Sequence, residues 1–104
     1  MDRLNQLLKL HATSPEDAFL LFAIAKEYEK QNDYVKAIDY YKSLLSKNKD
    51  YIAAYYHLGK VYEVMEDIQN SREIYSSGIK IAQDIKDHKT LAELRNALMN
   101  LEMD

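Results

Sequence analysis

Histidine, cysteine and paired acidic residues are the side chains that most often bind metals or carry catalysis, and this sequence uses them sparingly. The chain of 104 residues has no cysteine and three histidines, His11, His57 and His88. The histidines fall on separate segments, and none has a second ligand at a metal-binding spacing. No glycine-rich phosphate loop, nucleophile motif or pair of catalytic carboxylates is present. The sequence therefore predicts a protein that is not an enzyme and that holds no metal and no cofactor.

The charged residues do not favour nucleic acid or a membrane as the partner. The formal net charge is −3, and the lysines and arginines are interspersed with acidic residues. The chain therefore lacks the positive field that collects phosphates. No apolar run approaches the length of a membrane span, and residues 1–6 show no signal-peptide pattern. We expect a cytoplasmic protein whose partner is another protein or a peptide.

The composition is typical of a helical globular domain. Apolar residues make up 47% and charged residues 30% of the chain, which is the balance of a protein with a real core. Only 2 glycines and 1 proline appear, so few residues break helices or form hairpin turns. A chain of this length has room for one core. We expect a single all-α domain over residues 1–104.

A repeat of 34 residues organises this domain. When residues 18–51 are laid on residues 52–85, seven positions are identical, against about two expected from average composition. The identical pairs are Lys26/Lys60, Tyr28/Tyr62, Glu29/Glu63, Asp33/Asp67, Tyr41/Tyr75, Ser43/Ser77 and Asp50/Asp84. Two copies of one structural unit are the simplest explanation.

Each copy has the pattern of two helices. In residues 18–51, apolar residues recur at helical spacing on both sides of Asn32 and Asp33, which interrupt the pattern. Asp33 and its equivalent Asp67 stand just before the second helix of each pair. A carboxylate there can accept hydrogen bonds from the free backbone N–H groups of the first turn.

One further helix is expected at each end. Residues 2–13 resemble the second helix of a truncated leading repeat, and residues 88–102 carry a narrow leucine stripe typical of a capping helix. The first helix expected in residues 18–51 ends before Asn32. We expect it to start near Pro15, with Ser14 as its N-terminal cap. The two flanking helices would cover the apolar ends that two repeats leave bare.

The spacing of small, large and aromatic residues resembles that of the tetratricopeptide repeat family, W-x2-L-G-x2-Y followed by A-x3-F and a closing proline. Both copies place such residues in register: Leu21-x2-Ile24-Ala25-x2-Tyr28 with Ala37-x3-Tyr41, and Tyr55-x2-Leu58-Gly59-x2-Tyr62 with Ser71-x3-Tyr75. The small residues would let the paired helices approach closely. Neither copy has the family's tryptophan. Both copies also lack the closing proline, and Lys49 and Gln83 stand at its position.

The resemblance implies a right-handed superhelix of antiparallel helix pairs, with two full repeats between an N-terminal half repeat and a C-terminal capping helix. It also implies a concave face, lined by the first helix of each pair, that binds a peptide or a partner protein. The residues of those helices that packing does not use are Phe19, Phe22, Lys26, Glu29, Tyr56, Lys60 and Glu63. The aromatic residues would make hydrophobic contacts, and the lysines would meet an acidic group. The family's lysine and asparagine clamp for a terminal carboxylate is not implied, because lysines stand where asparagines would help.

Other interpretations stay open. Each lysine could simply pair with the glutamate three residues further on, and Phe19 could pack on the preceding helix near Leu7 or Leu10. The chain could instead be a structural protein that forms a weak homodimer through its terminal helices, where Met99 and Met103 lie beside the leucine stripe. A small molecule in the groove is a third possibility.

Overall fold

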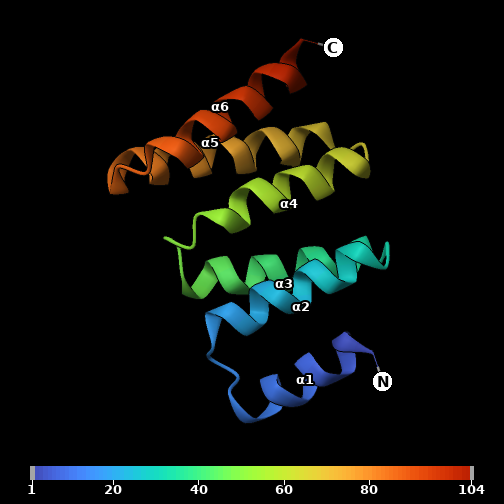
Figure 1. Cartoon of the computed structure of the whole chain (residues 1–104). Coiled ribbons are helices and arrows are strands. Elements are labelled where there is room, and N and C mark those ends of the chain that lie inside the picture. Colours follow the sequence, from blue (N-terminus) through green and yellow to red (C-terminus); the bar gives the residue numbers. More distant parts are fainter. Residues whose placement is uncertain (1, 104) are drawn as a thin grey trace. The chain divides into compact units, whose positions relative to one another are not determined.

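Helices account for nearly all of residues 2–103, the part of the chain that the computed structural model describes (Figure 1). They are α1 (Arg3–Thr13), α2 (Ala18–Lys30), α3 (Tyr34–Lys47), α4 (Ala53–Val64), α5 (Ile68–Ile85) and α6 (His88–Glu102). Residues 18–51 thus hold one helix pair and residues 52–85 hold another. No strand occurs in the described range. The all-α helical repeat fold expected from the sequence is confirmed.

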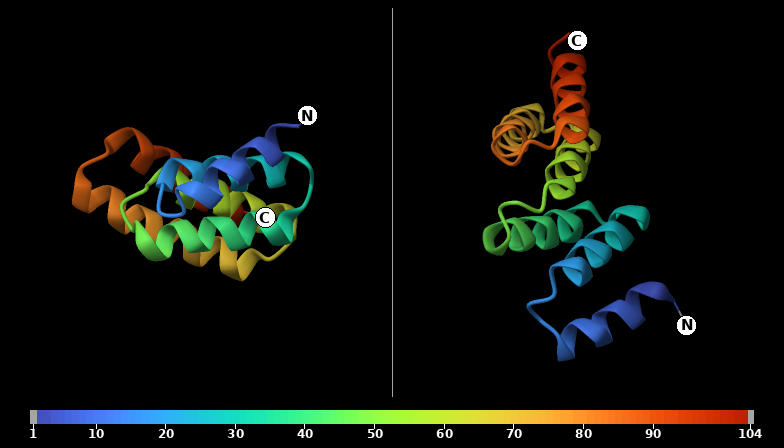
Figure 2. Two further views of the ribbon diagram at one scale, coloured as in Figure 1. Left: turned by 90° about the horizontal axis from the view of Figure 1, so that it is seen from below. Right: turned by 60° about the vertical axis from the view of Figure 1, so that its left-hand side comes forward.

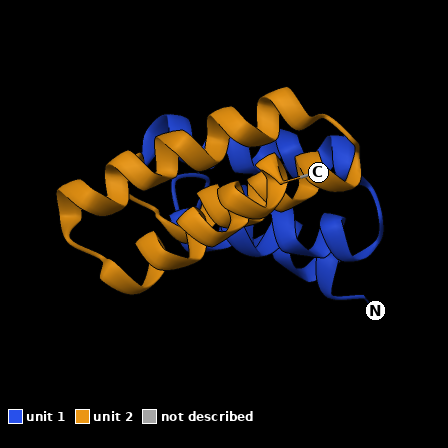
Figure 3. Ribbon diagram, turned by 90° about the horizontal axis from the view of Figure 1, so that it is seen from above, with its two compact units in different colours: residues 1–48 blue, residues 49–104 orange. Residues whose placement is uncertain are grey.

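The helices group into two compact units, residues 1–48 and 49–104 (Figure 3). Unit 1 contains α1, α2 and α3, and unit 2 contains α4, α5 and α6. Within each unit, successive helices run in opposite directions (Figures 1 and 2). The single domain and the superhelical arrangement of the pairs stay predictions.

Aspartates begin most of the helices. Their side chains accept a hydrogen bond from the backbone N–H three residues further on, which satisfies a donor that the helix itself leaves free. The donor–acceptor distances are 2.8 Å for Asp2, 3.2 Å for Asp17, Asp33 and Asp67, and 3.1 Å for Asp87. The predicted capping roles of Asp33 and Asp67 are confirmed. Only α4, among the helices of residues 2–103, begins without a side-chain cap.

The predicted start of α2 at Pro15 is wrong. Asp17 caps this helix, which begins at Ala18, and Pro15 lies in the preceding turn. Ser14 ends α1 instead, where its backbone N–H donates to the carbonyl oxygens of Leu10 (3.0 Å) and His11 (3.2 Å). Asp17 takes over because its carboxylate is an acceptor at least as strong as the Ser14 hydroxyl.

Both helix pairs turn through the same backbone conformation. Asn32 and Glu66, which are equivalent in the repeat, have positive φ angles of 64° and 60°. The next residue in each copy, Asp33 or Asp67, donates its N–H back to the carbonyl oxygen of Tyr28 or Tyr62 at 2.9 Å. The left-handed residue lets the N–H groups of the turn satisfy the last carbonyl groups of the first helix, and the chain reverses over the three residues between the paired helices.

Two glycines let the helices of unit 2 approach closely. The ring of Tyr75 lies where a Cβ on Gly59 would stand, and a Cβ on Gly78 would come within 2.6 Å of the Tyr55 Cβ. Ser71, which is fully buried, donates from its hydroxyl to the Gly59 carbonyl oxygen at 2.9 Å. The small residues at positions 59 and 71 therefore do what the repeat pattern predicts.

Leucines hold α1 against α2 in unit 1. Leu4 and Leu7 of α1 pack in one cluster with Leu20 and Ile24 of α2. The interpretation that Phe19 packs on α1 is wrong, because its side chain is 63% exposed. Leu20, one residue and about 100° further round the helix, occupies that contact instead.

Candidate functional site

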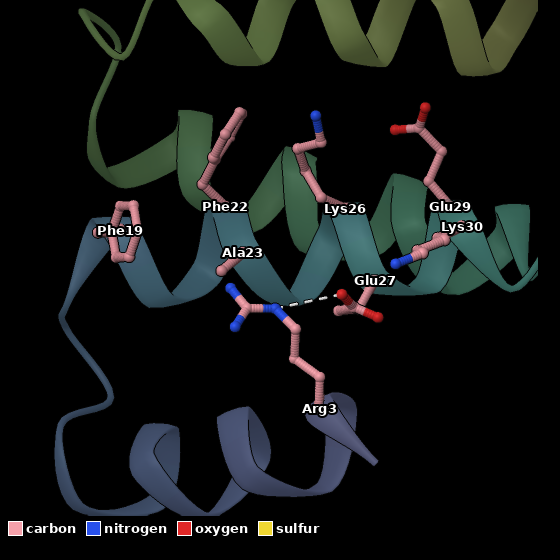
Figure 4. Close-up of a pocket in the computed structure, with 8 residues that line it drawn as sticks. All are labelled: Arg3, Phe19, Phe22, Ala23, Lys26, Glu27, Glu29 and Lys30. Atoms are coloured by element: carbon pink, nitrogen blue, oxygen red, sulfur yellow. Dashed lines mark ion pairs between the residues drawn. The ribbon is translucent and has the colours of Figure 1, made fainter.

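Three of the residues implied as binding residues project from one side of α2, the side away from α1. These are Phe22, Lys26 and Glu29 (Figure 4). The Lys26 Nζ lies over the Phe22 ring, 5.9 Å from its centroid. The same ring contacts Tyr41 of α3 edge-on, with 6.1 Å between centroids. The spacing of three and four residues thus brings an aromatic ring, an ammonium group and a carboxylate together.

Tyr41 holds the carboxylate of this group in place. Its side chain is fully buried, and its hydroxyl donates to Glu29 Oε1 at 2.8 Å. Burial, and after it the hydrogen bond and the charge of Glu29, raise the pKa of Tyr41 well above its ordinary value. The hydroxyl therefore stays protonated and keeps donating at physiological pH.

Unit 2 contains the same arrangement. The Lys60 Nζ lies 5.4 Å from the centroid of the Tyr56 ring, and the Tyr75 hydroxyl donates to Glu63. Burial and then Glu63 raise the pKa of Tyr75, and a hydrogen bond with Ser71 opposes the shift. We call each set of four a quartet: Phe22, Lys26, Glu29 and Tyr41 in unit 1, and Tyr56, Lys60, Glu63 and Tyr75 in unit 2.

The two quartets differ at their lysines. The Lys60 Nζ lies 3.7 Å from Glu63 Oε2, so the interpretation of a plain ion pair three residues apart is confirmed there. Within residues 2–103, no carboxylate lies within ion-pair distance of the Lys26 Nζ, and the same interpretation is wrong for this lysine. Its closest described partner is the Phe22 ring. Lys26 is therefore better placed than Lys60 to pair with a carboxylate from outside.

A hollow of about 500 Å³ opens beside the first quartet in unit 1. Residues of α1 and α2 line it: Arg3, Phe19, Phe22, Ala23, Lys26, Glu27, Glu29 and Lys30 (Figure 4). Arg3 reaches across from α1 and forms an ion pair with Glu27, with 3.2 Å between Nε and Oε1. Phe19, Phe22, Lys26 and Glu29 are thus brought together around one space. The volume of this hollow is large enough to hold a few side chains of a bound peptide.

The sequence interpretation missed the contribution of the second helices and of α1. The repeat pattern marks Tyr41 and Tyr75 only as aromatic positions, yet their hydroxyl groups position Glu29 and Glu63. A signal existed, because a glutamate and a tyrosine recur 12 residues apart in both copies. Nothing in the repeat pattern points to Arg3, which lies outside both copies.

The remaining polar groups give no sign of a metal site. Within the described range, no group of three histidine, cysteine or acidic side chains is close enough to hold a metal ion. The His11 ring stands edge-on to Tyr40, with 6.2 Å between centroids, in a smaller hollow of about 280 Å³. Over residues 2–103, none of the helices is long and apolar enough to cross a membrane. The expected cytoplasmic location stays a prediction.

Comparison with known proteins agrees with the helix pairs. A family model described as tetratricopeptide repeat matches residues 28–98. Among solved structures, a tetratricopeptide repeat domain protein from Salinibacter ruber is 34% identical, with 85% of this chain and 89% of that chain covered and a TM-score of 0.80. No curated protein matches the chain.

Two more distant structures share the fold. A protein from Bordetella parapertussis has 23% identity, with 99% of this chain and 90% of that chain covered and a TM-score of 0.87. The TPR2B domain of yeast Sti1, in a complex with pHsp70, has 13% identity, with 96% and 80% covered and a TM-score of 0.89. At these identities the likeness concerns the helix arrangement alone.

Proposed function

Because the chain belongs to the tetratricopeptide repeat family, we propose that it is a non-catalytic module that binds a peptide or a partner protein on its quartets. The binding surface would be the face of α2 and the face of α4 that carry the quartets, which in the family's repeat arrangement belong to the concave side. A related fold is seen in the Sti1 domain in complex with pHsp70.

The observation that carries this proposal is that the same quartet is built twice. In each copy a lysine lies over an aromatic ring, and a buried tyrosine holds the glutamate. Packing alone does not require that a buried tyrosine hydroxyl hold a glutamate at the surface. Groups that are already held in place lose less side-chain entropy when a partner binds. Aromatic side chains also supply much of the energy of protein interfaces.

A charge-reversal experiment tests the proposal. The double variant Lys26→Glu with Lys60→Glu should keep its helicity and melting temperature, because exposed charges contribute little to stability. It should recover less of the proteins that the wild-type chain captures from its native cells, as measured by quantitative mass spectrometry. Lys42→Glu with Lys80→Glu makes the same charge change on exposed positions of α3 and α5 and serves as the control. Equal recovery by both double variants would contradict the proposal.

The absence of catalysis is part of the proposal. The titratable groups of the quartets already hold one another: Glu29 accepts from Tyr41, and Glu63 pairs with Tyr75 and Lys60. A general acid or base must instead be within reach of a substrate proton. A thermal-shift screen with small metabolites and cofactors tests this part, and a saturable hit that Lys26→Glu abolishes would favour a ligand-binding function.

Self-association through α6 is the second candidate function. Met99 and Met103 are 56% and 76% exposed, although the leucine stripe of the same helix is mostly covered. Exposed methionines are common at interfaces. Light scattering at high micromolar concentration should then show a dimer that Met99→Lys with Met103→Lys converts to monomer. A wild-type chain that stays monomeric would remove this candidate.

A further inference from the structure

We propose that the hollow of unit 1 recognises an acidic peptide segment that is anchored by an aromatic side chain. The inference rests on the proposed function and names the chemistry of the partner. Unit 1, where α1 and α2 line the hollow, would then determine which partner is bound (Figure 4).

The hollow of unit 1 carries an excess of positive charge. Both of its carboxylates already have partners, because Glu27 pairs with Arg3 at 3.2 Å and Glu29 accepts from Tyr41 at 2.8 Å. Lys26 and Lys30 are exposed, and neither has a carboxylate within ion-pair distance in the described part of the chain. Arg3, Lys26 and Lys30 outnumber the two carboxylates, because the neutral Tyr41 hydroxyl does not cancel the charge of Glu29. The hollow therefore keeps one net positive charge on a chain whose net charge is −3. Charge complementarity favours an acidic occupant.

Aromatic surface is exposed in the hollow of unit 1. Phe19 is 63% exposed at one end of the hollow, and Phe22 is half-buried beside it. Ala23 also lines the hollow and leaves room there, because its side chain is a single methyl group. A large apolar side chain from a partner would cover these rings and remove them from water.

The spacing of Phe22, Lys26 and Lys30 along α2 fits an extended peptide. With a rise of about 1.5 Å per residue, Lys26 and Lys30 lie about 6 and 12 Å along the helix axis from Phe22. An extended peptide advances about 3.3 Å per residue. A segment that places its aromatic residue beside Phe22 would therefore meet the two lysines about two and four residues further on. The expected pattern is aromatic-x-acid-x-acid, in either chain direction.

Unit 2 does not repeat these features. The equivalents of Phe19 and Lys30 are Ala53 and Val64, so the exposed phenylalanine and the second ammonium group are both missing. The equivalent of Lys26 is Lys60, which already pairs with Glu63 at 3.7 Å. The two quartets thus share their framework, and the acidic preference belongs to unit 1.

Fluorescence anisotropy with the full chain tests the inference. The probe is a dye-labelled, C-terminally amidated peptide with one phenylalanine and aspartates two and four residues after it, together with the same peptide in reverse order. Amidation removes the terminal carboxylate, so binding can come only from side chains and backbone. At least one direction should bind, with an affinity that falls as salt is added. Replacing the aspartates by lysines, or the phenylalanine by alanine, should weaken binding about tenfold or more.

Variants of the protein locate the site. Lys26→Glu with Lys30→Glu, and separately Phe19→Ser, should each weaken binding of the acidic peptide about tenfold. Lys36→Glu with Lys42→Glu, at exposed positions of α3, is the matched control and should bind like the wild type. Helicity is measured for every variant, so that a loss of binding is not confused with a loss of fold.

Three results would overturn the inference: no binding of either acidic peptide, equal binding of the lysine peptide, or equal binding of a single-stranded oligonucleotide. The proposed function is judged separately. If the acidic peptides fail while Lys26→Glu with Lys60→Glu still reduces partner recovery, only the chemistry of the partner is wrong. If the peptides bind but that double variant recovers partners as the wild type does, the acidic site stands and the proposed role of the quartets fails.

Discussion

The ring of Tyr75 lies against the backbone of Gly59, in the space that any larger residue at position 59 would need. The same side chain is fully buried and donates from its hydroxyl to Glu63. One tyrosine therefore closes the contact between α4 and α5 and also fixes a carboxylate on the surface of α4. Packing and the candidate binding surface are linked through this residue.

Gly59→Leu should destabilise the fold by about 1–3 kcal/mol, because the new side chain would overlap a ring that has no room to move. Urea denaturation followed by circular dichroism measures the change. Ala92→Leu makes a similar substitution at an exposed position of α6 and should change stability little. A Gly59→Leu variant as stable as the wild type would show that the contact between Gly59 and Tyr75 is misplaced.

Tyr75→Phe should cost about 0.5–1.5 kcal/mol, because it removes a part-buried hydrogen bond and leaves Glu63 without its tyrosine donor. Tyr34→Phe removes a hydroxyl that donates to Asn32 on the exposed surface at 2.9 Å, and it should cost less. Denaturation curves of the two variants, measured side by side, decide the point. Equal losses would mean that the bond to Glu63 contributes nothing specific.

Two of the nine tyrosines, Tyr41 and Tyr75, should resist ionisation most strongly, and burial together with the charge of Asp50 raises the pKa of Tyr55 as well. Burial, followed by the bonds to Glu29 and Glu63, raises the pKa of Tyr41 and Tyr75 above the ordinary value near 10. The pKa of both tyrosines is higher in the folded state than in the unfolded state. The stabilisation that the two protonated hydroxyl groups give the fold is therefore fully present below about pH 10 and is lost as the pH rises further.

Tyrosinate absorbance and circular dichroism, recorded in one alkaline titration, measure this resistance. The last tyrosines should ionise only as helicity is lost, and Tyr41→Phe with Tyr75→Phe should remove most of that late phase and leave the part that belongs to Tyr55. Complete ionisation near pH 10 with unchanged helicity would contradict the burial of these hydroxyls.

The start of α6 should weaken in acid. Hydrogen bonds from the Thr90 backbone N–H (3.1 Å) and hydroxyl (2.9 Å) lower the pKa of the Asp87 carboxyl. The pKa of Asp87 is therefore lower in the folded state than in the unfolded state. The stabilisation that the ionised cap gives the fold is present above the ordinary pKa of about 4 and is lost as the pH falls through the folded-state pKa.

Amide exchange in the first turn of α6, measured across the acidic range, tests this expectation. Protection should fall with pH in the wild type and less in Asp87→Asn, which keeps a capping oxygen without a titratable charge. An identical fall in both proteins would place the acid-sensitive group elsewhere.

Much of the fold could be predicted because its signals are local and repeated. Asp33 and Asp67 cap equivalent helices, and one recurring aspartate predicts both. Gly59 and Ser71 stand where the repeat needs small residues, so the close helix contact followed from their size. The periodic pattern shows which residues of a helix face its neighbour, because residues on the same face recur with every turn.

The errors came from choices that local sequence leaves undecided. Ser14 and Asp17 can both cap a helix, and only the structure shows that Asp17 caps α2. Phe19 and Leu20 are adjacent apolar residues, and it is Leu20 that packs against Leu4 and Leu7 of α1.

The bonds that complete the quartets could not be predicted for a related reason. Each joins a glutamate to a tyrosine on the neighbouring helix, 12 residues away. Whether the hydroxyl reaches the carboxylate depends on how the helices cross, which the pattern of either helix does not contain.

Site-specific photo-crosslinking to a partner protein tests most directly whether the quartet faces are the binding surface. Benzoylphenylalanine replaces Phe19 of α2 in one variant and Tyr56 of α4 in another. In a third variant, which serves as the control, it replaces Val35, which is 63% exposed on α3. After irradiation with the most abundant protein that the wild-type chain captures, adducts should form at positions 19 and 56 and be scarce at 35. Adducts at position 35 without any at 19 or 56, or equal adducts at all three, would contradict the account.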